Sequence, residues 1–519
     1  MVVGFKMNDK VDIPLISSSD NSSSGRIGRV EEVIRFIESR YVDDLDTEPI
    51  IDKAILAAMN ELDPHSIFLT KEQMAQVNEE MGGEYRGIGI ETFYIDDTVN
   101  VIMPVKDSPA EKGGIKAFDK IIRINDSLVA GNGLLFRDIR SLLRGKVGTP
   151  LNIEVLSRES SEPKSLEVVI EDLPYKSVNR YFMAKDNIAY IKIDRFSQKT
   201  YEEFMQAIEY LGENKGARHL IIDLRDNPGG VLPDATEILS QLFIQKGNML
   251  VYTQGKNERK NEYKSTGKPF FNIDKIAILI NENSASGSEI VAGAIQDWDR
   301  GVIIGRRSFG KGLVQDQYNL SDGSAIRLTV ARYYTPSGRS IQKDYRNGNY
   351  SADLQDRYDG GEFFDQDSIP HNDSLRFKTK ILGRRIFGGG GISPDIFVPM
   401  DSIQLYTSFQ NLMSSIPRFA YQYALNHEVE MPEDAEAFID NWPLPTDLES
   451  SFISYLEKAD INEGKIAPEY KEEALKEIQY HLGRMHYGRN MVDRLLISKD
   501  AFVDEAINFI EGEHMLNDL

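Results

Sequence analysis

Two short, uninterrupted apolar runs constrain the fold of this chain more than any other feature. LIIDL begins at Leu220 and IAILI begins at Ile276. Runs of this kind are typical of strands that are buried on both faces of a sheet. The segments at 200–215 and 232–243 have the apolar spacing of helices, which can cover such a sheet. We therefore predict an α/β layered core with a buried sheet between residues 185 and 336.

Changes in periodicity divide the chain of 519 residues further. The predicted fold class is multidomain α+β, with these segments: a flexible N-terminal segment at 1–25, a helical N-terminal cap at 26–81, a β-domain at 82–172, the α/β core at 173–400 with a polar insertion at 341–381, and a C-terminal helical domain at 401–519. We expect the insertion to be an exposed loop. The Ser-rich N-terminal segment has no apolar signal-peptide core, and we expect it to be a flexible tether.

Composition excludes several classes of function. The formal net charge of −22 argues against binding to nucleic acid or to an anionic membrane surface. The absence of cysteine excludes disulfides, thiol catalysis and Cys-ligated zinc. No run of 18 apolar residues exists, so we predict no membrane-spanning segment. The seven histidines form no closely spaced ligand group, and we expect neither a metal site nor a cofactor.

The β-domain contains a candidate peptide-binding loop. Gly87, Ile88, Gly89 and Ile90 form a GIGI sequence whose successive backbone N–H groups can hold a carboxylate. The strand that follows can pair with an extended peptide if it lies at a sheet edge. Together with SPAEKGGIKAFDKIIRIN further along the chain, this order resembles a PDZ domain, circularly permuted as in bacterial proteases. A purely structural β-domain is the alternative.

Residues 281–315 contain the candidate catalytic groups. A Ser-rich turn precedes a helical pattern, and a Gly-flanked lysine, Lys311, follows a strand-like GVIIG. A serine near a helix N-terminus and a lysine from another element can supply a nucleophile and its base. Ser284, Ser286 and Ser288 compete both as nucleophiles and as helix caps, and Ser286 also matches the S-x-x-E capping box.

Two other glycine-rich segments need separate consideration. Residues 305–311 match G-x-x-x-x-G-K, but Gly312 follows where a nucleotide-binding P-loop needs Ser or Thr, and the next residues predict a strand. We therefore do not expect nucleotide binding. Gly229 and Gly230 follow the LIIDL strand, where they can direct backbone N–H groups outward. An ordinary strand-to-helix turn explains them equally well.

Several motifs together resemble one enzyme family. LDPHS, DLRDNPGG, SASGSEIVAGAIQD, SFGKGLVQ and GGGGISPD occur in this order over residues 30–399, as in the carboxyl-terminal processing proteases, or tail-specific peptidases. The resemblance implies a ClpP/crotonase-like protease core and a Ser–Lys dyad. The nucleophile falls on Ser286, the base on Lys311 and a supporting glutamine on Gln315.

The resemblance also implies roles for other residues. The oxyanion of the tetrahedral intermediate would be bound by the N–H of Gly287 and by that of Gly229 or Gly230. This chain has Gly287 where the family usually has alanine, which changes little if only the backbone N–H contributes. Arg144 matches a family arginine that links the PDZ domain to the core.

The implied function is that of a serine endopeptidase that recognises protein C-termini through its PDZ domain. The implied substrates are proteins or peptides with an accessible, apolar C-terminus, and the implied location is the periplasm or cell envelope. The C-terminal helices are candidates for forming a homo-oligomer or binding an adaptor. The alternative is a catalytically inactive or gated peptide-binding scaffold.

Overall fold

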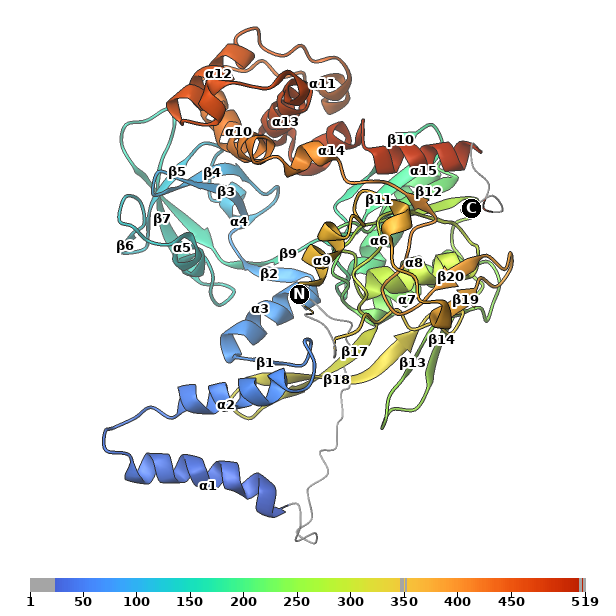
Figure 1. Cartoon of the computed structure of the whole chain (residues 1–519). Coiled ribbons are helices and arrows are strands. Elements are labelled where there is room, and N and C mark those ends of the chain that lie inside the picture. Colours follow the sequence, from blue (N-terminus) through green and yellow to red (C-terminus); the bar gives the residue numbers. More distant parts are fainter. Residues whose placement is uncertain (1–23, 346–349, 351, 513–515, 517–519) are drawn as a thin grey trace.

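The computed structural model describes residues 24–345, 350, 352–512 and 516, so the predicted tether lies mostly outside the described residues. The N-terminal region consists of α1 (Ser24–Arg40), α2 (Glu48–Asn60), β1 (Ile67–Leu69) and α3 (Lys71–Gly82). Helices α1 and α2 extend away from the body of the molecule (Figure 1), and α2 has no buried residue. Thr70 and Gln73 form a capping box at the start of α3, which fixes where this helix begins.

The β-domain is a separate sheet with its own apolar core. Its elements are β2 (Glu84–Gly87), β3 (Ile90–Ile95), β4 (Thr98–Pro104), α4 (Pro109–Lys112), β5 (Lys120–Ile124), β6 (Ser127–Leu128), α5 (Phe136–Leu142), β7 (Pro150–Leu156), β8 (Lys164–Val169) and β9 (Glu171–Pro174). The strand order is β3-β4-β5-β7-β8, with β6 on β5, while β2 pairs with β9. Strand β3 therefore lies at the sheet edge, as the peptide-binding hypothesis requires.

The core sheet has the order β10-β11-β12-β15-β16-β21 and is parallel except for β10. Its elements are β10 (Arg180–Lys185), β11 (Ile188–Lys192), α6 (Thr200–Glu209) with a π-turn (Tyr210–Asn214), β12 (His219–Asp223), α7 (Leu232–Gln241), β15 (Ile276–Ile280), α8 (Gly287–Asp297), β16 (Val302–Gly305) and β21 (Ile396–Phe397). The two apolar runs form the adjacent strands β12 and β15, with Ile222 opposite Ile278. The predicted buried sheet is thus present, and α7 and α8 pack on one face of it.

A second, antiparallel sheet lies beside the core and has the order β1-β18-β13-β14, with β17 on β18. Its further elements are β13 (Met249–Gln254), β14 (Asn261–Lys264), β17 (Leu313–Asn319) and β18 (Ala325–Tyr334). Strand β1 pairs with β18 through Ile67 and Arg327. The N-terminal cap is therefore fastened to the core by a strand of three residues.

The insertion at 341–381 differs from the exposed loop that was predicted. It contains α9 (Asp353–Asp359), two 3-10 turns (Gln366–Ser368 and Asp373–Leu375) and β19 (Arg376–Lys378), which pairs with β20 (Arg385–Phe387). Arg357 and Glu362 are buried in it, and both Arg357 and Arg307 of the core pair with Glu362. Much of the described segment is exposed, as predicted, but it is not a plain loop, because Arg357 and Glu362 attach it to the core through buried ion pairs.

The C-terminal region is helical, as predicted, but it does not form one unit. Its elements are a 3-10 turn (Ser402–Leu405), α10 (Thr407–Asn426), α11 (Ala435–Asn441), α12 (Leu448–Lys458), a second 3-10 turn (Asn462–Gly464), α13 (Pro468–Tyr487), α14 (Arg489–Ile497) and α15 (Ala501–Glu511). Helices α10, α12 and α13 share one apolar cluster. Helix α15 instead covers the second face of the core sheet, because Phe502, Ala506 and Phe509 pack against β15 and β16.

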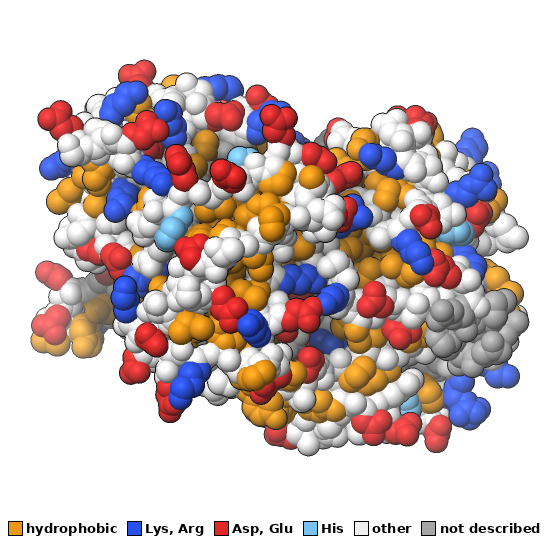
Figure 2. Space-filling model, turned by 90° about the horizontal axis from the view of Figure 1, so that it is seen from above, with side chains coloured by type: hydrophobic (Ala, Val, Ile, Leu, Met, Phe, Trp, Pro, Cys, Tyr) orange, Lys and Arg blue, Asp and Glu red, His pale blue; other side chains and the backbone are white. Residues whose placement is uncertain are grey.

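Two features of the surface bear on possible partners. Acidic and basic side chains are interspersed over the face shown in Figure 2, without a continuous basic field. Among the helices that the structure describes, none combines the length and the apolar character needed to cross a membrane.

Candidate active site

Ser286 lies at the junction between helix α8 and the loop that follows strand β15. Its backbone has φ 52° and ψ −108°, a conformation that usually requires glycine and costs about 1–3 kcal/mol. Every residue of α8 is buried, so the helix is enclosed on all sides. Because α8 is buried in this way, it is held in place, and it holds Ser286 at its start in the strained backbone conformation.

The three candidate serines have different hydrogen-bond partners. The hydroxyl of Ser284 donates to the carbonyl of Leu224 at 2.8 Å, and that of Ser288 donates to the carbonyl of Asn227 at 2.9 Å. No residue in the described part of the chain accepts a hydrogen bond from the hydroxyl of Ser286. Ser284 and Ser288 therefore fasten the loop, and only Ser286 keeps its hydroxyl proton available.

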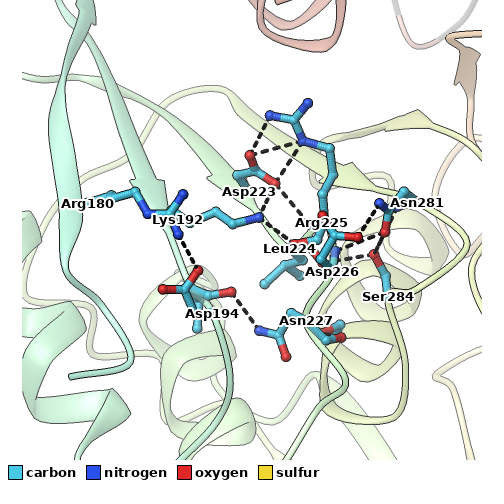
Figure 3. Close-up of polar contacts among 12 residues, drawn as sticks. Arg180, Lys192, Asp194, Asp223, Leu224, Arg225, Asp226, Asn227, Asn281 and Ser284 are labelled. Atoms are coloured by element: carbon cyan, nitrogen blue, oxygen red, sulfur yellow. Dashed lines mark hydrogen bonds and ion pairs between the residues drawn. The ribbon is translucent and has the colours of Figure 1, made fainter. Parts of the chain in front are cut away.

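The turn after β12 and the serine loop form one hydrogen-bonded unit (Figure 3). The N–H of Asp226 donates to Asn281 Oδ1, and Asn281 Nδ2 donates to Asp226 Oδ1, both at 2.9 Å. The N–H of Ala285 donates to the carbonyl of Asn227 at 2.9 Å. The side chain of Asn227 donates in turn to the carbonyl of Ile193, at the end of β11. Three neighbouring segments of the core thus position the serine.

Gly229 is the residue of this turn that touches the serine. Its φ is +94°, and a Cβ on it would lie 2.6 Å from Ser286 Cβ and 2.8 Å from the nitrogen of Gly287. Any larger residue would displace the serine loop, so this position requires glycine for its space as well as for its backbone conformation.

The two glycines of the turn differ in what their N–H groups do. The N–H of Gly229 donates to Asn227 Oδ1 at 2.8 Å. Neither the N–H of Gly230 nor that of Gly287 donates to any acceptor among the described residues. A free N–H beside a strained serine is available to a substrate oxygen, which favours Gly230 over Gly229 as the partner of Gly287.

Lys311 lies between β16 and β17 and is 1% exposed. Its Nζ has no hydrogen-bond partner among the described residues. Burial lowers its pKa to about 7, helped by the positive charge of Arg327 and opposed by the negative charges of Glu289 and Asp63. A lysine in this state can be a neutral amine near neutral pH, as a general base must be.

The backbones of Ser286 and Lys311 are held by the same two side chains. Glu289 Oε2 accepts the N–H of Ser286 at 2.8 Å and that of Lys311 at 2.9 Å. The Tyr333 hydroxyl contacts the carbonyls of the same two residues, at 3.1 and 2.5 Å. A displacement of either candidate residue is therefore transmitted to the other.

Gln315 lies on β17, opposite Thr329 on β18. Its Nε2 donates to Thr329 Oγ1 at 3.1 Å, while its Oε1 is buried without a partner among the described residues. Within those residues, Lys311 Nζ is hydrogen-bonded neither to Ser286 nor to Gln315. The structure brings the three predicted residues into one region but does not connect their reacting atoms.

The predicted peptide-binding loop borders a cavity of about 930 Å³ between β3, α5 and α3. The backbone of residues 87–90 lines it, although the side chain of Ile88 is 2% exposed and lies in the apolar core of the β-domain. Arg144 also lines it and forms an ion pair with Glu79 of α3 at 3.0 Å. The arginine therefore contacts the N-terminal cap rather than the serine or the lysine.

Sequence reasoning missed three residues of the site. Glu289 was noted only as part of a capping box, although a buried carboxylate after a candidate nucleophile was a usable signal. Tyr333 lies in a strand-like run where nothing distinguishes it from a core residue. Asp63 lies in the LDPHS motif, but no spacing rule connects that motif to a lysine about 250 positions further along the chain. Within the described residues, no group of three or more His, Asp or Glu side chains can hold a metal ion.

Comparison with known proteins places this chain in a family. The model of peptidase family S41 matches residues 187–348, which include Ser286 and Lys311. A probable CtpA-like serine protease of Staphylococcus epidermidis is 33% identical over 328 residues, which are 63% of this chain and 65% of that protein. The carboxy-terminal processing protease CtpA of Bacillus subtilis is 34% identical over 340 residues, or 65% of this chain and 71% of that protein.

Two further proteins are similar. The carboxy-terminal-processing protease of Bartonella bacilliformis is 32% identical over 63% of this chain and 75% of its own length. Among solved structures, the photosystem II D1 C-terminal processing protease has 25% identity and a TM-score of 0.35, over 72% of this chain and 89% of that one. The chain belongs to the carboxy-terminal processing proteases of peptidase family S41.

Proposed function

We propose that this protein is a serine endopeptidase that cleaves peptide bonds with a dyad of Ser286 and Lys311. The observation that supports this best is the buried lysine. Its pKa is lowered to about 7, and it shares the supports Glu289 and Tyr333 with the serine. Burying an amine without a partner destabilises a fold, so its presence beside a strained serine favours a catalytic role.

The proposed reaction begins when neutral Lys311 takes the hydroxyl proton of Ser286. The serine oxygen then forms a bond to the carbonyl carbon of the substrate, and the carbonyl oxygen becomes an oxyanion. The N–H groups of Gly287 and Gly230 donate to that oxyanion. As the intermediate collapses, the C–N bond breaks and the lysine returns its proton to the leaving amine. Water then hydrolyses the acyl-enzyme by the same steps.

Residues 82–172 are proposed to be a permuted PDZ domain that selects the substrate. The edge position of β3 and the cavity beside residues 87–90 support this, because an extended peptide can add to the free edge. The proposed substrates are proteins with an accessible, apolar C-terminus. The pair of Arg144 and Glu79 is a candidate link between this domain and the cap.

A gated state is the second candidate, and one observation favours it. The amine of Lys311 is not hydrogen-bonded to the hydroxyl of Ser286 among the described residues. We propose that the resting enzyme keeps the dyad apart until substrate binds. A permanently inactive scaffold is the limiting case of this state.

Location and partners are proposed from the family. The resemblance to the tail-specific peptidases implies the periplasm or cell envelope, and the proposed partners are substrate proteins rather than nucleic acid. Helices α10 to α14 are the proposed surface for a second copy of the chain or an adaptor.

The test is cleavage of fluorescein-labelled β-casein and of a peptide with a free or an amidated C-terminus. Ser286→Ala and Lys311→Ala are each expected to abolish cleavage while the far-UV circular dichroism stays unchanged, and amidation is expected to lower the rate. Normal turnover by Ser286→Ala would refute the assignment. If the wild-type protein cleaves none of these substrates, the inactive scaffold is favoured.

A further inference from the structure

The LDPHS turn of the N-terminal cap reaches the region of Lys311. Asp63 Oδ1 accepts the N–H groups of His65 and Ser66 at 2.9 and 3.0 Å, and Oδ2 accepts the Ser66 hydroxyl at 2.6 Å. These bonds make a closed turn just before β1. Since β1 pairs with β18, the turn lies against the strand that contains Thr329.

A chain of hydrogen bonds continues from this turn into the core. The hydroxyl of Thr329 donates to Asp63 Oδ1 at 3.0 Å, and it accepts Gln315 Nε2 at 3.1 Å. The N–H of Thr329 donates to the Ser66 hydroxyl at 3.1 Å. The cap and the supporting glutamine are therefore joined through one threonine side chain.

The direction of these hydrogen bonds is fixed because they end at the carboxylate of Asp63. A hydroxyl has a single proton, and an ionised carboxylate can only accept. Because Thr329 gives its proton to Asp63, it offers Gln315 only a lone pair. The amino group of the Gln315 amide must then face Thr329. Its carbonyl oxygen must face the other way, where Oε1 is the free acceptor.

The orientation of this amide matters to a lysine that acts as a base. A carbonyl oxygen directed at the amine accepts one of its hydrogens and leaves the nitrogen lone pair free to take the serine proton. An amino group in the same place would donate to that lone pair and occupy it. Lys311 Nζ and Gln315 Oε1 are both buried without partners among the described residues, so they are a donor and an acceptor that can pair when the site closes on substrate.

We infer that Asp63 is a positioning residue for the proposed base. Acting through the hydroxyl of Thr329, it fixes the amide of Gln315 with its carbonyl oxygen directed at the lysine. The inference rests on the proposed function, and it gives the N-terminal cap a part in catalysis without contact to the substrate. Other charged or titratable groups near the lysine include Arg327 and Tyr333 on β18, Glu289 on α8 and His65 in the turn itself.

Thr329 allows a test that leaves the turn intact. Thr329→Val has nearly the same shape but no hydroxyl, while Asp63 keeps its two backbone donors. Thr329→Ser keeps the hydroxyl and is the matched control. With fluorescein-labelled β-casein, Thr329→Val is expected to lower kcat about 10- to 100-fold with KM changed less than about twofold. Thr329→Ser is expected to stay within about threefold of wild type. A wild-type kcat in Thr329→Val, or an equal loss in both variants, would overturn the inference.

A double-mutant cycle separates the relay from the charge of Asp63. Asp63→Asn alone is expected to lower kcat. In the Thr329→Val background, where the relay is already broken, it is expected to change kcat less than about twofold. If the losses in kcat of the two single variants multiply in the double variant, Asp63 acts by a route other than Thr329, and the relay is refuted.

A measurement without substrate keeps the inference testable if the proposed function fails. In protein labelled with [13Cε]lysine, the titration of Lys311 is followed by its 13C shift, assigned by its absence in Lys311→Ala. A carbonyl dipole directed at the amine favours the ammonium even without a hydrogen bond. Thr329→Val leaves the amide free to turn its amino group towards the amine instead, so it is expected to lower the pKa of Lys311, whereas Thr329→Ser leaves it unchanged. An equal pKa in wild type and Thr329→Val would overturn the relay. Absence of Ser286-dependent cleavage in wild type would refute only the proposed function.

Discussion

The carboxylate of Glu289 accepts the backbone N–H of Lys311 at 2.9 Å, although the two residues belong to different elements. The same carboxylate accepts the N–H of Ser286 and of Gly310 and the hydroxyl of Ser308, at 2.8, 2.7 and 2.5 Å. Burial raises the pKa of Glu289 to about 7, while these four donors lower it. One side chain on α8 thus connects the segment before β17 to the candidate nucleophile.

Glu289→Gln is expected to disrupt this connection. All four neighbours donate, whereas one arm of a glutamine amide is itself a donor, so at least one N–H would be left facing an amino group. The expected loss is about 2–4 kcal/mol in the free energy of unfolding, with a drop in cleavage of at least about tenfold. Urea unfolding and β-casein cleavage measure the two effects.

Glu282→Gln is the control for this prediction, because Glu282 pairs with Arg306 outside the dyad. It is expected to keep cleavage. A Glu289→Gln protein with wild-type stability would indicate that the carboxyl is protonated in the folded protein.

The pKa of Lys311, lowered to about 7, predicts a pH dependence of cleavage. The proposed base must be neutral, so kcat/KM is expected to fall about tenfold per pH unit below about 7 and to level off above it. Measurement of kcat/KM between pH 5.5 and 9 tests this. If kcat/KM does not fall below about pH 7, proton transfer to the lysine does not limit the reaction.

The same buried amine is expected to cost stability. Between about pH 7 and 10.5 the unfolded chain binds a proton on Lys311 that the folded chain does not, so wild-type stability rises with pH across this window. Lys311→Met removes the charge but keeps the shape. It is expected to be more stable than wild type by roughly 2–4 kcal/mol at pH 7, with the advantage shrinking towards pH 10. Thermal unfolding at both pH values measures it, and a destabilised variant would contradict the desolvation argument.

The sequence predicted the local parts of the site better than their meeting points. The apolar runs predicted strands β12 and β15, and the motifs pointed to Ser286 and Lys311 as the proposed dyad, because these features are written in contiguous residues. The contact of Asp63 with Thr329 depends on a strand of three residues, β1, which has no readable period. The buried charges of the insertion were missed for a related reason. A polar segment predicts exposure unless its ion-pair partners are known, and Arg307 lies far from Glu362 in the sequence.

Gly229→Ala is expected to abolish cleavage by displacing the serine. The added Cβ would lie 2.6 Å from Ser286 Cβ and 2.8 Å from the nitrogen of Gly287, and φ is +94°. The matched control is Gly216→Ala, where φ is also positive, at +75°, but nothing lies within 4 Å of the added atom. The control is expected to lose about 1–2 kcal/mol of stability and to keep its activity. If both variants keep their activity, the close approach of Gly229 to the serine does not matter for catalysis.

Arg144 and Glu79 offer a test of communication between the β-domain and the cap. Their side chains are 35% and 23% exposed, so breaking the pair is expected to change stability by less than about 1 kcal/mol. If the pair links the peptide-binding loop to α3, Arg144→Glu lowers cleavage of a peptide with a free C-terminus at least about fivefold. The double variant Arg144→Glu/Glu79→Arg then restores part of it, because the ion pair is re-formed in reverse. Arg123→Ala, which breaks the exposed pair of Arg123 and Glu154 in the same domain and away from the cavity, is the control and is expected to have no effect. Initial rates with free and amidated peptides decide the matter. Failure of the double variant to regain activity would mean that Arg144 acts on the peptide itself rather than through Glu79.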